Sequence, residues 1–178
     1  TRSDWSSDVC SSDLEPGRGP LWMQLHWLHD RGFLQALVQR AEASGFDALV
    51  LTVDAPTQGA RDRERRAGFA LPPGVRMRNL DGLAPRPAEP LANAGSALFD
   101  GLMPHAATWD DIVWLQGQTR LPLLLKGVLH PADACQAASL GVAGLIVSNH
   151  GGRTLDTAVA TAQALPRIAQ ALAARPGP

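Results

Sequence analysis

The chain has 178 residues, of which 45% are hydrophobic, and its formal net charge is -1. This length suits one globular domain, and the near balance of charges argues against nucleic acid or an anionic membrane surface as a partner. The two cysteines indicate no disulfide framework, and the apolar runs are shorter than a membrane span. We therefore expect a cytoplasmic protein without membrane attachment.

The first residues differ in composition from the rest of the chain. Segment 4–14 is rich in Ser and Asp and has neither helical nor strand periodicity. It looks like the translation of a sequencing adapter, so we expect residues 1–14 to be a non-native tail and residues 15–178 to form the domain. The alternative is a natural disordered tail.

The next segments predict a unit of strand, helix and strand. Segment 21–27 is a short apolar strand. A helical pattern follows Asp30 and stops at Gly45, with its apolar residues on one face. Segment 48–53 is a second apolar strand, which ends just before Asp54.

The middle of the chain has a different character. Segment 57–107 is rich in Pro and Gly and is expected to be a long loop, of the kind that is a functional lid or is partly disordered. Its charged run, 61–66, carries both signs, which is typical of a solvated face. The Thr108 to Asp111 sequence then resembles a capping box and predicts a helix that ends near Thr119.

Further strands and helices alternate to the end of the chain. Segment 122–128 is a third apolar strand, interrupted by Lys126, and segment 144–147 is a fourth. Pro131 and Gly141 bracket the helix between them, and Ala134, Cys135 and Ala138 are expected to face inward. After the fourth strand we expect a helix from Thr157 that Pro166 restarts as a second one. This alternation predicts an α/β fold with a parallel sheet.

Each predicted strand ends in polar residues. In a parallel barrel these ends share one rim, so side chains far apart in the sequence can converge there. Taken alone, Lys126 is more simply a snorkelling or salt-bridged lysine, and Asp54 a turn cap before Pro56. The polar ends are Gln24 with His26, Thr52 with Asp54, Lys126, and the segment from Ser148 to Arg153.

The last of these strand ends has the most specific sequence. Gly151 and Gly152 allow a tight turn and a close approach to a ligand, while His150 and Arg153 supply a proton acceptor and a two-pronged carboxylate binder. A histidine in a glycine-rich loop can equally be a hydrogen-bonded turn residue.

Residues 148–156 read Ser-Asn-His-Gly-Gly-Arg-Thr-Leu-Asp. This stretch resembles the signature of the FMN-dependent α-hydroxy acid dehydrogenases and oxidases, with Thr154 where that family usually has Gln. The resemblance implies a partial (β/α)8 TIM barrel that covers roughly barrel strands three to six. It also implies FMN as cofactor, oxidation of a small L-2-hydroxy acid to a 2-oxo acid, and a homo-oligomeric parent protein.

The resemblance also assigns roles to individual residues, and it implies no metal site. His26 stands where the family commonly has a substrate-contacting Tyr, and the chain contains no Tyr. The implied catalytic pair is His150 as base with Asp54 as its partner; the substrate contacts are Arg153, Arg61 and His26; the flavin contacts are Gln24, Thr52 and Lys126.

Two alternatives stand beside this interpretation. A complete barrel needs about 250 residues and takes its phosphate site from the loops after strands seven and eight. The chain can therefore be an inactive truncated fragment that cannot hold FMN. The other alternative is a different FMN-dependent barrel enzyme, such as an isomerase or a nitronate oxidiser, which would not require the set of Asp54, His150 and Arg153.

Overall fold

The computed structural model describes residues 19–56, 62–85 and 103–175. The predicted tail 1–14 and Arg61 lie outside these ranges. The strands are β1 (Trp22–His26), β2 (Ala48–Thr52), β3 (Leu123–Lys126) and β4 (Gly144–Ile146). The helices are α1 (Arg31–Ala43), α2 (Asp62–Arg66), α3 (Trp109–Gln116), α4 (Pro131–Ser139) and α5 (Thr161–Ala173), with single 3-10 turns η2 (Arg78–Leu80), η4 (Met103–His105) and η5 (His150–Gly152).

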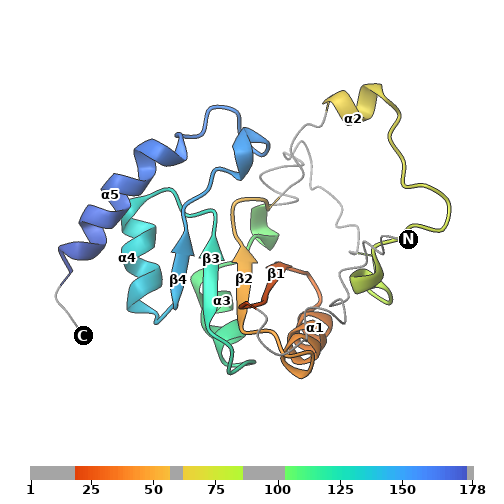
Figure 1. The fold of residues 1–178 in the computed structure, drawn as a ribbon, viewed down its shortest axis with the longest axis horizontal. Coiled ribbons are helices and arrows are strands. Elements are labelled where there is room, and N and C mark those ends of the chain that lie inside the picture. Colours follow the sequence, from red (N-terminus) through yellow and green to blue (C-terminus); the bar gives the residue numbers. More distant parts are fainter. Residues whose placement is uncertain (1–18, 57–61, 86–102, 176–178) are drawn as a thin grey trace, which may run out of the picture.

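The strands form one sheet in the order β1-β2-β3-β4, and every neighbouring pair is parallel (Figure 1). Each of the first three strands is thus followed by a helical connection that returns the chain to the same end of the sheet. Parallel strands that are neighbours both in sequence and in space are the repeating unit of a (β/α)8 barrel. The prediction of an α/β fold that forms part of such a barrel is confirmed.

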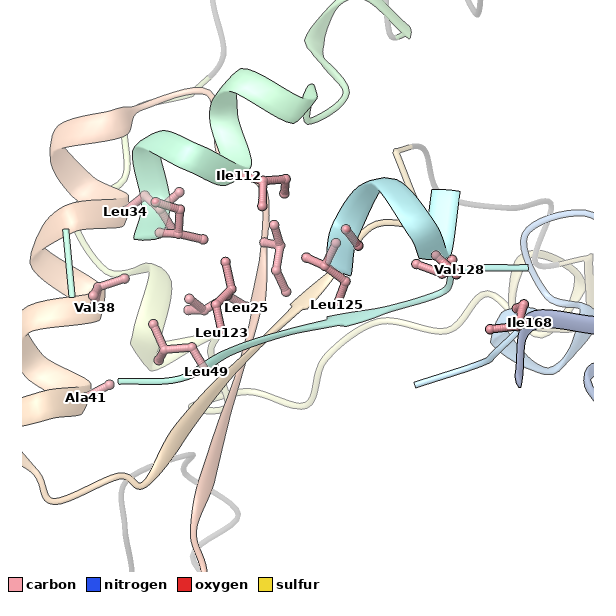
Figure 2. Packing of buried hydrophobic residues seen from close by; sticks show 14 of the residues in the cluster. Leu25, Leu34, Val38, Ala41, Leu49, Ile112, Leu123, Leu125, Val128 and Ile168 are labelled. Carbon is pink, nitrogen blue, oxygen red and sulfur yellow. The ribbon is translucent and has the colours of Figure 1, made fainter. Parts of the chain in front are cut away.

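The core lies between one face of the sheet and the helices (Figure 2). The register aligns Leu25 with Leu51, and Leu51 with Leu125, so these leucines form one row on that face. Leu34 from α1 and Leu115 from α3 are fully buried in the same cluster. Burying each such side chain contributes about 1.5 to 3 kcal/mol, which fixes which face of the sheet the helices cover.

Capping residues in the sequence define where the helices begin. The Asp30 side chain accepts a hydrogen bond from the Phe33 amide at 2.9 Å and begins α1. Thr108 and Asp111 exchange backbone and side-chain hydrogen bonds at the start of α3, so the predicted capping box is confirmed. Pro131 occupies the first turn of α4, as predicted. These caps supply acceptors for amide groups that have no partner inside the helix.

An ion pair at the end of β1 ties α1 to α3. Arg31 donates to the Asp111 carboxylate. Its guanidinium also lies over the rings of Trp27 and Trp114, at 5.8 and 5.2 Å from their centroids. Burial alone would raise the pKa of Asp111, but hydrogen bonds from Thr108 and Arg31 outweigh burial and lower it. The segment after β1 is therefore held against two helices.

The C-terminal helix differs from the sequence prediction. No helix begins at Thr157; α5 runs unbroken from Thr161 to Ala173 with Pro166 inside it. Ala164 and Ile168, four residues apart, are both buried on one side of this helix. A single helix axis keeps both side chains in the core, and this packing outweighs the local cost of a proline.

Two smaller predictions also need correction. In α4 the fully buried residues are Ala134 and Ala137, whereas Cys135 and Ala138 are only partly buried. Within segment 57–107, residues Asp62–Arg66 of the charged run form the short helix α2 and not a loop. None of the residues of α2 is buried, which agrees with the interpretation of that run as a solvated face.

Candidate functional site

The polar ends of three strands lie in one row across the sheet. The register pairs His26 with Thr52, and Thr52 with Lys126. These residues alternate with the buried leucines of the same strands, so their side chains project from the face opposite to the helices. In a closed barrel this face is the interior, and the row lies at its C-terminal rim.

Gln24 connects two members of this row. It precedes His26 by one full strand repeat, so both side chains leave β1 on the same side. Its amide nitrogen Nε2 donates to Thr52 Oγ1 at 2.8 Å and lies 3.4 Å from His26 Nε2. Because an amide NH2 group only donates, His26 Nε2 acts as the acceptor and Nδ1 carries the ring proton. The contact thus requires a neutral His26.

The surroundings of His26 also favour its neutral form. Burial lowers the pKa of His26, and the nearby His150 and Lys126 lower it further, while Asp54 opposes them. Residues from the ends of the other three strands therefore lie close enough to influence this ring.

His150 and Asp54 form a short polar contact between the ends of β4 and β2. His150 Nδ1 donates to Asp54 Oδ1 at 2.9 Å, and the exposed fractions of the two side chains are 24% and 10%. Since a carboxylate only accepts, the proton lies on Nδ1 and Nε2 is left free to accept another. The other carboxylate oxygen, Oδ2, is buried without a hydrogen-bond partner in the described part of the chain. Among the described residues, His150 is thus the only hydrogen-bond donor to this carboxylate.

The backbone after β4 holds His150 in an uncommon conformation. His150 has φ 56°, and Gly151 and Gly152 also have positive φ. The His150 amide donates to Ser148 Oγ at 3.0 Å, and the Gly151 amide donates to Asn149 Oδ1 at 3.1 Å. Positive φ in a non-glycine residue costs energy, so these side-chain acceptors stabilise a turn that aims the imidazole back toward Asp54.

Arg153 follows the same turn and is turned toward α2. Its Nη2 atom lies 3.7 Å from Glu64 Oε1, and the exposed fractions of the two side chains are 58% and 43%. An exposed contact at this distance is weak. The geometry does show that the Arg153 guanidinium can receive a carboxylate beside the His150 turn.

The structure therefore brings most of the predicted site residues together. Gln24, Thr52, His26 and Lys126 share one face of the sheet, and Asp54 pairs with His150. Arg61 lies outside the described residues, so its position is not part of this geometry. Sequence reasoning missed Glu64 as a neighbour of Arg153, and it missed Gly127, which lies against Asp54. The only signal for Gly127 was its place directly after Lys126.

The sequence model of the family described as FMN-dependent dehydrogenase matches residues 3–176. The chain belongs to this family. It is 46% identical over 170 residues to an L-lactate oxidase of Alicycliphilus denitrificans, with 94% of this chain and 46% of that protein covered. It is 39% identical over 176 residues to glycolate oxidase 1 of Oryza sativa, covering 98% of this chain and 48% of that protein.

Solved structures of family members have the same fold. A mandelate oxidase variant with (S)-mandelic acid superposes with a TM-score of 0.71 and 40% sequence identity, covering 88% of this chain and 40% of that one. The chain thus spans about half the length of the curated relatives that it matches.

Within residues 19–56, 62–85 and 103–175, no helix has the length and apolar character needed to cross a membrane. The same ranges contain no group of three or more His, Cys, Asp or Glu side chains that could hold a metal ion.

Proposed function

We propose that the protein oxidises a small L-2-hydroxy acid to the 2-oxo acid with FMN as cofactor. The observation that carries this proposal is the 2.9 Å contact between His150 and Asp54 at the rim that also holds Lys126. The family relatives named L-lactate oxidase, glycolate oxidase and mandelate oxidase support the same reaction class.

The polar row suits one edge of a flavin. FMN, when bound, accepts the two electrons that the hydroxy acid loses. Lys126 can place a fixed positive charge where the reduced ring becomes negative, and its side chain makes no hydrogen bond to another described residue that would compete. Gln24 already donates to Thr52, so the amide and the hydroxyl present a connected pair of hydrogen-bonding groups beside that charge.

His150 acts as the base in this proposal. Its Nδ1–H is held by Asp54, so Nε2 takes the proton from the substrate. The resulting imidazolium is stabilised by the adjacent carboxylate, whose second oxygen has no other donor among the described residues. Asp54 thus orients the ring before the reaction and balances its charge afterwards.

The substrate carboxylate is held by arginine in this proposal. Arg153 already lies beside a carboxylate, that of Glu64, and its planar fork can bind a small carboxylate with two hydrogen bonds. Arg61 is proposed as a second contact, as the family resemblance implies. His26 is proposed to touch the substrate through Nδ1–H, because its Nε2 faces Gln24.

The test is the His150→Gln substitution in the FMN-loaded protein. We expect reduction of the flavin by lactate, glycolate or mandelate to slow by at least ~100-fold, because glutamine cannot take the proton. His29→Gln is the matched control. It replaces a histidine by glutamine in the segment between β1 and α1, and it should keep the wild-type rate of flavin reduction. A smaller loss in His150→Gln would reject His150 as the base.

Compartment and assembly stay predictions. A reducing cytoplasm is supported by the low cysteine content, and Cys135 is a free thiol. A homo-oligomeric state is supported by the family resemblance alone.

A further inference from the structure

Gly127 lies at the point where the His150–Asp54 pair crosses the sheet. Asp54 follows β2 and His150 follows β4, so the strand between them is β3, which ends at Lys126. Gly127 is the first residue past that end, and its amide donates to the Ile146 carbonyl of β4 at 3.0 Å. The hydrogen bond between the pair therefore passes over this glycine.

The space for the Asp54 side chain exists because residue 127 has no side chain. A Cβ atom at Gly127 would lie 2.4 Å from both Cβ and Cγ of Asp54, and 2.9 Å from its amide nitrogen. Such approaches are far inside van der Waals contact, so one of the two residues would have to move. Gly127 also has φ 111°, a conformation that side chains disfavour.

Few other contacts fix the Asp54 carboxylate. Its Oδ1 accepts from His150, and its Oδ2 is buried with no hydrogen-bond donor among the described residues. A carboxylate that is held by one hydrogen bond depends on packing for the rest of its orientation. The bare α-carbon of Gly127 provides that packing surface.

We propose that Gly127 is a positioning residue that acts through Asp54 on His150. By leaving room for the carboxylate over the end of β3, it keeps Oδ1 in line with Nδ1 and leaves Nε2 free. The adjacent Lys126 and Gly127 thus have separate tasks, one supplying charge to the row and the other supplying space to the pair. The catalytic consequence rests on the proposed function, whereas the effect on the hydrogen bond does not.

The direct test is NMR spectroscopy of the protein labelled with 15N-histidine, at a pH where the rings are neutral. The His150 signals are assigned by their loss in His150→Gln. In the wild-type protein we expect a protonated, slowly exchanging Nδ1 on His150. In Gly127→Ala the carboxylate is displaced, so the Nδ1 proton signal should be lost and the ring should adopt a mixture of tautomers.

Gly141→Ala is the matched control. Gly141 also has positive φ, 77°, but a Cβ atom there would meet nothing within 4 Å. Gly141→Ala therefore places a side chain at a positive φ without the clash, and the His150 signal should persist. Retention of the Nδ1 proton in Gly127→Ala, or its equal loss in Gly141→Ala, would overturn the proposal.

A second variant covers the case in which Gly127→Ala does not fold. In the double variant Asp54→Gly with Gly127→Ala, the two carbon atoms nearest to the new methyl group are gone. Folding of the double variant, seen by circular dichroism, would show that contact with Asp54 causes the defect. Failure of the double variant to fold would show that the backbone, through the positive φ of residue 127 or its 2.9 Å approach to the amide nitrogen of residue 54, requires the glycine without any part of the Asp54 side chain, and would overturn the proposal.

Measuring the rate of flavin reduction distinguishes failure of the Gly127 proposal from failure of the proposed function. In the FMN-loaded protein, Gly127→Ala should slow reduction by at least about tenfold with little change in KM, because substrate binding does not involve Asp54. Adding Asp54→Asn should slow it little further, since both changes break one hydrogen bond. If no hydroxy acid reduces the wild-type flavin, the proposed function fails while the NMR result still decides the role of Gly127.

Discussion

At the scale of single residues, backbone strain and the proposed function coincide at His150. It is the non-glycine residue with positive φ in the described part of the chain, and it is also the proposed base. Ser148 and Asn149 offset that strain by accepting hydrogen bonds from the backbone of the turn. The strained backbone conformation of His150 thus directs its imidazole toward Asp54.

Arg153 is expected to be sensitive to the shape of its charged group. In Arg153→Lys the positive charge remains, but the planar fork that aligns a carboxylate is lost. We expect KM for the hydroxy acid to rise roughly tenfold and flavin reduction to slow by roughly ten- to a hundredfold. Steady-state and stopped-flow measurements separate the two effects. Arg167→Lys on the exposed side of α5 is the control, and equal kinetics in both variants would contradict the role of Arg153.

His26 is expected to make folding depend on pH. Burial and the neighbouring His150 and Lys126 lower the pKa of His26 below its ordinary value of 6.5, against the opposing Asp54. Below about pH 6.5 the unfolded chain therefore takes up a proton at this ring that the folded chain resists, so stability falls as the pH falls. Above that pH the effect is absent.

Urea unfolding at several pH values tests this prediction. In His26→Gln the residue no longer titrates, so the loss of stability between about pH 6.5 and pH 5 should be smaller than in the wild-type protein. An unchanged pH dependence in His26→Gln would show that other groups cause the loss.

At the scale of secondary-structure elements, α5 contains a proline, Pro166, that does not contribute to the buried face of the helix. Pro166 is exposed and lies inside the helix, where it has no amide to donate and its ring crowds the preceding turn. Pro166→Ala should raise the free energy of unfolding by about 1 to 3 kcal/mol, partly offset by greater freedom of the unfolded chain.

The control for this prediction is Pro131→Ala. Pro131 occupies the first turn of α4, where its missing amide costs nothing and its fixed φ suits the helix. Denaturant unfolding should therefore show a gain for Pro166→Ala and none for Pro131→Ala. Equal effects at both positions would mean that the helix interior tolerates proline here.

The elements also show what the sequence could predict. The strands follow from apolar runs such as segment 48–53, and the start of α3 follows from the chemistry of Thr108 and Asp111. The extent of α5 did not follow, because the buried pair Ala164 and Ile168 decides it through tertiary contacts. Local rules for proline describe the cost of a residue but not the packing that outweighs it.

The same division holds for the candidate site. That polar residues after parallel strands converge was predictable from topology, and Gln24, Thr52 and Lys126 do lie on one face. The fit of Asp54 against Gly127 was not predictable, since a clash of 2.4 Å depends on the exact twist of two neighbouring strands. Sequence patterns indicate which side chains meet, whereas distances between them require coordinates.

At the scale of the whole molecule, the separation of Asp54 and His150 along the chain affects how the site forms. These residues are 96 positions apart, and β3 lies between their strands, whereas Gln24 and Thr52 are 28 apart on adjacent strands. Closing the longer loop costs more entropy, and it requires β3 to be in place first. During folding the row that is proposed to face the flavin can therefore start to assemble from β1 and β2, while the pair of Asp54 and His150 forms only when β4 has docked. A partly folded chain would thus acquire its proposed binding groups before its proposed base.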